Sequence, residues 1–268
     1  MTMERFKLNV KIFFEGAYLS YIGLFRWLTP TTYFATLVFG PLTQMLFFVL
    51  IGTYAQGTDR AYFYVIGNAL MNAAMSGIYG VTMSIGGERW SGTLPYLFGA
   101  PANRMSLFIG RAFMHVLNGM VGVFTGLLWG WLLFNIDYSA TDPWALLLTI
   151  LITTFSTSGL GLLMGCIGLI TRNVMFVNNT VYFVLLVFSG ANLEISNLPA
   201  WMQVVSKYLP LTRGIAATRQ LIAGHSLADI RPLLLEELAI GAFFALLGYS
   251  LFRWFEFVAK KRGTLEVF

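Results

Sequence analysis

Long runs of apolar residues, each bounded by polar or charged positions, recur along the whole chain. A helix needs about 20 such residues to cross the hydrocarbon core of a bilayer. The runs therefore predict an all-α membrane protein, a single transmembrane domain over residues 1–268, with six transmembrane helices at 30–55, 61–85, 106–135, 144–170, 173–192 and 233–255. The last run is uncharged only over 238–252, so it spans only if Glu236 and Glu237 lie at one membrane surface and Arg253 reaches the other.

The first 26 residues are not a spanning run, but their apolar residues recur at helical spacing. Phe6, Val10 and Phe13 follow this spacing, and Lys7 and Lys11 interrupt it. The pattern predicts an amphipathic helix at 1–26 that lies in the membrane interface, with Lys7 and Lys11 as anchors for the anionic headgroups of the cytosolic leaflet. A solvated N-terminal tail is the alternative.

The segment 86–104 is too polar to span a membrane, yet it has the pattern of a short helix. Gly92 and Thr93 predict a turn and a helix cap, Pro95 suits the first helical turn, and Gly99 and Pro101 end the helix. The apolar face of this helix would consist of Leu94, Leu97 and Phe98. The charged residues at its flanks are Glu88, Arg89 and Arg104. We expect this helix to lie across the cytosolic mouth of the protein.

A third segment without a spanning run, 194–228, predicts a helical hairpin that dips into the outer leaflet. Pro199 and Pro210 bracket one amphipathic stretch, which begins with Trp201, and Gly224 ends a second stretch. Neither stretch is long enough to cross the membrane. Because backbone at membrane depth needs protein or water to satisfy its polar groups, the hairpin must lean on a helix bundle or a cavity.

The composition supports a membrane protein: 57% of the residues are hydrophobic and only 11% are charged, and the mean hydropathy is +0.71. Soluble domains carry about 25% charged residues. Too few charges are available to cover a water-facing surface, which excludes a soluble enzyme, a nucleic-acid binder and a disordered linker.

The charges also predict the orientation. If both termini are cytosolic, 12 of the 17 basic residues and 5 of the 12 acidic residues lie on the inner side. Basic residues concentrate on the cytosolic side of membrane proteins. We therefore expect a multi-pass protein of the plasma membrane, in bacteria the inner or cytoplasmic membrane, with both termini in the cytosol. Arg111, at the inner end of 106–135, is interpreted as a further interfacial anchor.

The sequence offers no recognisable catalytic or metal site of its own. Its two histidines, His115 and His225, are far apart, Cys166 is its single cysteine, and no HExxH motif is present. No GxxxxGK[ST] loop occurs, so the energy for any uphill transport must come from a partner or an ion gradient. Gradient-driven transporters usually carry acidic residues at mid-membrane, and none lies deep in the first five runs. An external motor is therefore favoured, and we expect the chain itself to bind no cofactor and no metal.

Uncharged polar residues inside the runs are candidates for a substrate path. Three of them, Asn68, Asn72 and Ser76, are four positions apart and would share one helix face, and Tyr79 lies close to this stripe. Two more, Asn178 and Asn179, lie in the fifth run. Such residues either line a path or join helices by hydrogen bonds.

The segment Glu88-Arg89-Trp90-Ser91-Gly92-Thr93-Leu94, followed by Leu97, Pro101, Arg104 and Gly110-Arg111, resembles the signature of type 2 ABC-exporter permeases. The outer segment, with Leu198-Pro199-Ala200-Trp201, Leu209-Pro210-Leu211-Thr212 and Arg219, also resembles that family. The resemblance covers nearly the whole chain. One departure is Pro95, where family members usually have a glutamate, and this removes one charge from the expected contact with the ATPase.

The resemblance implies a mechanism in which a separate motor moves this chain. Two permease subunits, either two copies or this chain and a paralogue, pair in the membrane. Two ATPase subunits, which bind ATP and Mg²⁺, dock beneath them. The helix around Leu94–Gly99 and the N-terminal interfacial helix transmit their movement. An amphipathic drug-, peptide- or lipid-like substrate then passes outward between the first, second and fifth spans.

Two alternatives are a permease for lipid-linked polysaccharide and, from a different class, a membrane scaffold that transports nothing. An intramembrane enzyme is a weaker alternative because the sequence lacks a recognisable site.

Overall fold

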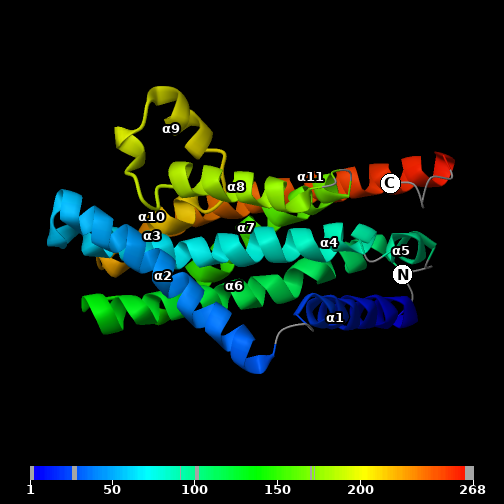
Figure 1. The fold of residues 1–268 in the computed structure, drawn as a ribbon, viewed down its shortest axis with the longest axis horizontal. Helices are drawn as coiled ribbons and strands as arrows, with labels where there is room; N and C mark the ends of the chain where they lie inside the picture. Colours follow the sequence, from blue (N-terminus) through cyan, green and yellow to red (C-terminus); the bar gives the residue numbers. More distant parts are fainter. Residues whose placement is uncertain are drawn as a thin grey trace.

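The computed structural model describes residues 3–25, 29–90, 92–99, 103–169, 171 and 173–262. All regular structure within these residues is helical, as the apolar runs predict. Figure 1 shows the long helices running along one axis of the molecule. The short helix α5, the start of α1 and the end of α11 gather at one end, and the junction of α2 with α3 lies at the other.

Helix α1 (Met3–Phe25) lies along the first part of α6 (Arg104–Phe134), as Figure 1 shows. The rings of Phe13 and Phe14 pack against Phe113 of α6, with centroids 5.3 and 5.7 Å away. Helix α2 (Pro30–Gln56) begins at Thr29, whose hydroxyl accepts a hydrogen bond from the backbone N–H of Thr32. The N-terminal segment is therefore a packed helix, while its location in the membrane interface stays a prediction.

The region predicted as the second span is one continuous helical rod of three parts. After the short 3₁₀ turn η1 (Thr58–Arg60), α3 (Ala61–Ala74) passes into a π-helical segment, η2 (Met75–Gly80), and then into α4 (Val81–Trp90). The rod thus extends beyond residue 85 into the predicted loop. A π-helix has a wider turn than an α-helix, so it changes which residues share a face.

The short helix α5 spans Leu94–Gly99, and α6 follows, with its N-terminus capped by the side chain of Asn103. Helix α7 (Pro143–Gly168) is capped in the same way by Asp142, and its first residue, Pro143, needs no hydrogen-bond acceptor there. These two long helices and the α3–η2–α4 rod enclose most of the buried apolar side chains.

The second half of the chain begins with α8 (Val174–Phe188), which has 15 residues and is followed by a loop with the 3₁₀ turn η3 (Ile195–Asn197). Two short helices, α9 (Ala200–Ser206) and α10 (Thr212–Ile222), precede α11 (Leu227–Arg262). Ser226 and Asp229 form a capping pair at the start of α11, and the hydrogen bonds from Ser226 lower the pKa of Asp229. Helix α11 has 36 residues and extends past the predicted span, 233–255, at both ends.

Among the described residues, three helices are long and apolar enough to cross a membrane by length and composition: α2, α6 from Met105 onward, and α7. Helix α8 is apolar but shorter than this, the rod of α3 and α4 is divided by η2, and α11 carries charges near both ends. The chain is therefore a membrane protein with at least these three candidate spans, and the six-span topology stays a prediction.

Glycines allow α7 to approach its neighbours very closely. A Cβ added to Gly161 would overlap the carbonyl oxygen of Gly77 in η2, and one added to Gly159 would overlap the carbonyl oxygen of Gly241 in α11. On α6, Gly126 lies in the same way against Ala69 of α3. The small-residue faces of α6 and α7 are thus used for packing within this chain.

Replacing Gly161 by alanine should destabilise the fold by about 3 kcal/mol, because α7 and η2 must separate to admit one methyl group. A lowered midpoint of thermal unfolding in detergent would report this loss. Gly40 of α2 is a matched control, since a Cβ there meets no atom within 4 Å. The prediction is contradicted if the two alanine variants unfold at the same temperature as the parent protein.

Candidate functional site

The predicted coupling segment, 86–104, is a turn between two helices with a short helix inserted. Gly92 has a φ of +66°, and nothing lies within 4 Å of the position that a Cβ would take. Glycine adopts this left-handed conformation at no steric cost, so the chain can reverse direction between α4 and α5. Thr93, which is exposed, directly precedes α5, and Pro95 occupies the second position of that helix, where an N–H would have no intrahelical acceptor.

Several residues of the predicted coupling set are located here by the helix in which each one lies. Glu88 and Arg89 lie in the last turn of α4, and Arg104 is the first residue of α6. Leu94 begins α5 and Leu97 lies within it. Pro101 lies outside the described residues. Tyr96 of α5 is 79% exposed, so this helix offers an aromatic side chain to a partner.

Helix α1 lies next to this segment at the same end of the molecule (Figure 1). Its anchors Lys7 and Lys11 are both exposed, and Lys11 forms an ion pair of 3.7 Å with Glu15. Its aromatic contacts with Phe113 tie it to α6, the helix that follows α5. The two elements expected to receive motion from a partner are therefore neighbours.

Arg111, which the sequence predicts as an interfacial anchor, is buried within the bundle. Its side chain is only 8% exposed, and its guanidinium donates a hydrogen bond to the backbone carbonyl of Ser84 in α4. One donor of the guanidinium thus has its acceptor inside the bundle. Arg111 therefore joins the two helices that flank α5, and its role as an interfacial anchor stays a prediction.

The residues of the polar stripe predicted on the second span bond to different parts of the bundle. Asn68 donates to Asn192 in the loop after α8, whereas Asn72 donates to the carbonyl of Gly122 in α6. Ser76 also bonds to α6, and Tyr79 turns to Asn179 of α8 at 2.5 Å. Each residue thus bonds to another part of the bundle, which is the helix-joining role. A role in lining a substrate path stays a prediction.

The two asparagines of α8 have different surroundings. Asn179 is exposed and bonds to the hydroxyl of Tyr79. Asn178 is fully buried, and neither atom of its amide has a hydrogen-bond partner among the described residues. An unpaired amide in an apolar interior costs free energy. Of this pair, Asn179 is therefore the one that can meet a substrate or a second subunit directly.

A hydrogen-bonded cluster that the sequence did not reveal joins α1, α2 and α6. The hydroxyls of Tyr21 and Tyr33 both donate to the amide oxygen of Asn118, at 3.1 and 2.6 Å. The amide nitrogen of Asn118 donates in turn to Ser76. Tyr21 and Tyr33 lie 97 and 85 positions before Asn118, so no local pattern could pair them. The cluster connects the N-terminal helix to the π segment of the predicted second span.

The outer segment is tied to the bundle by a buried carboxylate. The two oxygens of Glu237 in α11 accept hydrogen bonds from the backbone N–H groups of Leu211 and Arg213, at 2.6 and 3.2 Å. These groups lie at the N-terminus of α10, where a negative charge is favourable. Arg213 also pairs with Glu236. Pro210, just before this junction, is buried. Both glutamates thus hold α10, and their place at one membrane surface stays a prediction.

Helix α9 begins after Pro199 and leaves Trp201 63% exposed, with its ring 6.0 Å from that of Phe188 in α8. Both proline positions therefore bound α9 and the turn that follows, as the amphipathic stretch predicts. The entry of this part into the outer leaflet stays a prediction.

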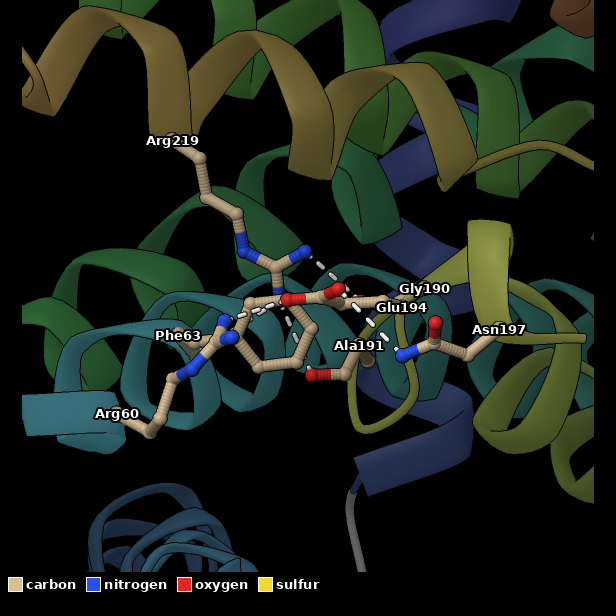
Figure 2. A network of polar contacts seen from close by, with 7 residues as sticks. All are labelled: Arg60, Phe63, Gly190, Ala191, Glu194, Asn197 and Arg219. Carbon is tan, nitrogen blue, oxygen red and sulfur yellow. Dashed lines mark hydrogen bonds and ion pairs between the residues drawn. The ribbon is translucent and has the colours of Figure 1, made fainter. Parts of the chain in front are cut away.

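Arg219 of α10 holds three chain segments together, as Figure 2 shows. Its guanidinium donates to the carbonyls of Gly190 at 2.9 Å, Ala191 at 3.1 Å and Phe63 at 2.8 Å. It also lies over the ring of Phe63, 3.6 Å from the centroid. Beside it, Arg60 forms an ion pair with Glu194. The resemblance to the permease family singled out Arg219. Its acceptors could not be predicted from the sequence, because they are backbone carbonyl groups, which every residue has.

The model of the ABC-2 type transporter family matches residues 20–223, from the last turn of α1 to the end of α10. The chain belongs to the ABC-2 type transporter family. No curated protein matches the sequence. The ABC-2 domain is the membrane permease domain of an ABC transporter, and ATP hydrolysis by such transporters lies in separate ATP-binding subunits. The matched region of this ABC-2 domain includes α5, the Asn118 cluster and the Arg219 network.

Proposed function

We propose that this ABC-2 domain is the permease subunit of an ATP-driven exporter that moves an amphipathic drug-, peptide- or lipid-like substrate out of the cytosol. Two ATPase subunits, with ATP and Mg²⁺, would dock at the end of the molecule that carries α5. A second permease, either another copy or a paralogue, would complete the path. We place the complex in the bacterial cytoplasmic membrane with both termini of this chain in the cytosol.

The family match over residues 20–223 carries this proposal, and the position of α5 supports it. In Figure 1, α5, the start of α1 and the end of α11 lie at the same end of the molecule. This end carries the exposed basic residues Lys7, Lys11 and Lys261, as expected for a cytosolic side. A partner that pushes on α5 would also meet α1, and Arg111 and the Asn118 cluster would pass the movement to α4, α2 and η2.

A second subunit would find an apolar surface on α2 and α8. The large exposed apolar side chains of this surface include Phe39, Phe47, Phe176 and Phe183. The hydrogen-bonded pair of Tyr79 and Asn179 lies beside this surface, because Asn179 is an exposed residue of α8. An amphipathic substrate needs an apolar path with a few polar contacts. Of the six predicted path residues, we therefore expect Tyr79 and Asn179 to contact it first.

Tyr79→Phe tests this path. Loss of the hydroxyl should change the stimulation of ATP hydrolysis by a panel of amphipathic compounds about threefold or more, with an unchanged yield of folded protein. Tyr54→Phe, at an exposed tyrosine near the end of α2, is the matched control and should behave as the parent. If Tyr79→Phe changes only the yield or the unfolding temperature, the hydroxyl joins helices and does not serve the path.

A further inference from the structure

A lateral groove of about 580 Å³ opens between α6, α7 and α11. Its floor is the face of α7 that carries Phe155, Ser158 and Leu162, and its walls are the first half of α6 and the middle of α11. The volume is in the range of sites that hold small molecules. The groove lies apart from the α2 and α8 surface, so the proposed substrate path does not account for it.

The groove faces the side of the bundle and is lined almost entirely by apolar atoms. The rim residues Ile109, Leu117 and Leu246 are 38, 42 and 59% exposed, so the opening itself is apolar. Two hydroxyl groups, those of Ser158 and Tyr249, are the polar exceptions in the lining. Since α6 and α7 have the length and composition of membrane spans, the groove opens to lipid tails and not to water.

The length of the groove is close to half the thickness of a hydrocarbon core. On α11 the lining runs from Leu238 to Tyr249, about 16 Å at the rise of an α-helix. Half of a hydrocarbon core is about 15 Å thick. Near Tyr249 the groove is bounded by packed rings, because Phe108 of α6 contacts both Tyr249 and Phe252. An extended acyl chain of one leaflet therefore fits this length.

The charges at the two ends of the groove set the direction of such a ligand. One turn beyond Tyr249 lies Arg253, which is half exposed and pairs with Glu256, and Glu256 also pairs with Lys260. With Lys261, which is exposed, this end has more positive than negative charges. At the other end, beside Leu238, Glu236 and Arg213 form an ion pair, so these two charges offset each other and give an anionic headgroup no net attraction. Trp254 is exposed next to Arg253, as is typical at the membrane interface.

We propose that this groove binds one acyl chain of a phospholipid, with the phosphate near Arg253 and the end of the chain toward Leu238. A bound chain would fill the space between α6 and α11, which contact each other through the rings of Phe108, Tyr249 and Phe252 near one end of the groove. The lipid would thus be a structural ligand of the permease and is separate from its exported substrate.

Photolabelling of the purified full chain in nanodiscs tests the proposal. The probe is a phosphatidylglycerol with a diazirine near the end of one acyl chain, and labelled peptides are identified by mass spectrometry. We expect residues 116–117, 151–152 and 238, which line the Leu238 end of the groove, to be labelled at least fivefold more than the exposed face of α2. Equal labelling of the groove and α2 would show ordinary boundary lipid only and would overturn the proposal.

A bulky side chain introduced inside the groove, compared with the same side chain outside it, gives a matched pair of variants. Ala242 lines the groove, whereas Ala239 on the same helix is exposed outside it. Ala242→Trp should lower the labelling of the groove at least fivefold, and Ala239→Trp should leave it unchanged. If Ala242→Trp does not fold, Ala242→Leu should give a smaller loss in the same direction. Full labelling of a folded Ala242 variant would contradict the site.

Two further comparisons separate a phospholipid tail from other occupants. A diacylglycerol with the same diazirine chain, which lacks the phosphate, should label the groove at least threefold less, and equal labelling would refute the role of Arg253. The hydroxyl of Ser158 is buried, at 2% exposed, and has no partner among the described residues. An acyl tail cannot bond to it, so Ser158→Ala should leave labelling unchanged. A clear loss in Ser158→Ala would indicate a polar ligand instead.

Discussion

Gly92→Val should reduce substrate-stimulated ATP hydrolysis of the assembled transporter at least tenfold while the permease still inserts and folds. The backbone at Gly92 has a φ of +66°, which a β-branched residue adopts only at a cost of about 1–2 kcal/mol or more. The chain can relieve this cost by changing the angle between α4 and α5. Because the position is exposed and a Cβ there would meet no atom of the described residues within 4 Å, the change should displace α5 without disturbing the bundle.

Two variants make this result specific. Gly92→Asn should keep most of the stimulation, since asparagine tolerates the left-handed conformation better than other residues with a Cβ. Gly99→Ala, at the end of α5, should behave as the parent, because a Cβ there meets nothing within 4 Å. The measurement is the rate of vanadate-sensitive ATP hydrolysis in proteoliposomes that hold both subunits. Normal stimulation of Gly92→Val would remove α5 from the coupling pathway.

Arg219→Met should cause the largest loss of stability, about 3–5 kcal/mol. The guanidinium donates to three backbone carbonyls and lies over the ring of Phe63, so its removal leaves these carbonyls without a donor in a mostly buried place. The junction of α3, the loop after α8 and α10 should open as a unit. Hydrogen exchange of residues 189–194 and the midpoint of thermal unfolding report this directly.

Arg231→Met is the control for the loss of one positive charge on the same end of the molecule, because Arg231 is exposed at the start of α11. We expect its unfolding temperature to match that of the parent. Arg219→Lys should recover only part of the stability, since an ammonium group cannot reach all three carbonyls in the planar geometry of a guanidinium. Equal stability of Arg219→Met and Arg231→Met would show that the network in Figure 2 does not hold the outer segment.

Much of the fold follows from residue patterns that act over short distances. The helical class follows from continuous apolar runs, and the start of α6 and α7 follows from Asn103 and Asp142. The turn before α5 follows from Gly92, the residue type that best tolerates its backbone conformation. The π segment at Met75–Gly80 could not be predicted, because no local pattern of residues marks it, and the packing of its Gly77 against Gly161 of α7 is a contact between distant parts of the chain.

The sequence predicted single residues of the candidate site but not the groups to which they bond. Arg219 was identified through the family resemblance, but its partners are backbone carbonyl groups that any residue could supply. Arg111 was expected at the membrane surface because a charge is costly inside a bilayer. In the structure its guanidinium donates to the carbonyl of Ser84, and no local sequence pattern predicts such an acceptor. Long-range pairs such as Tyr33 with Asn118 need the folded bundle before they can be identified.

The central claim, that this ABC-2 permease moves its substrate only when a separate ATPase drives it, is tested most directly in liposomes of defined composition. The tagged chain is purified from its native membranes, its co-purifying ATP-binding subunit is identified, and the two are reconstituted together and separately. The account predicts vanadate-sensitive, ATP-dependent movement of an amphipathic dye in liposomes with both proteins and none with the permease alone. Movement of the dye by the permease alone, at the same rate as with its partner and ATP, would contradict the account.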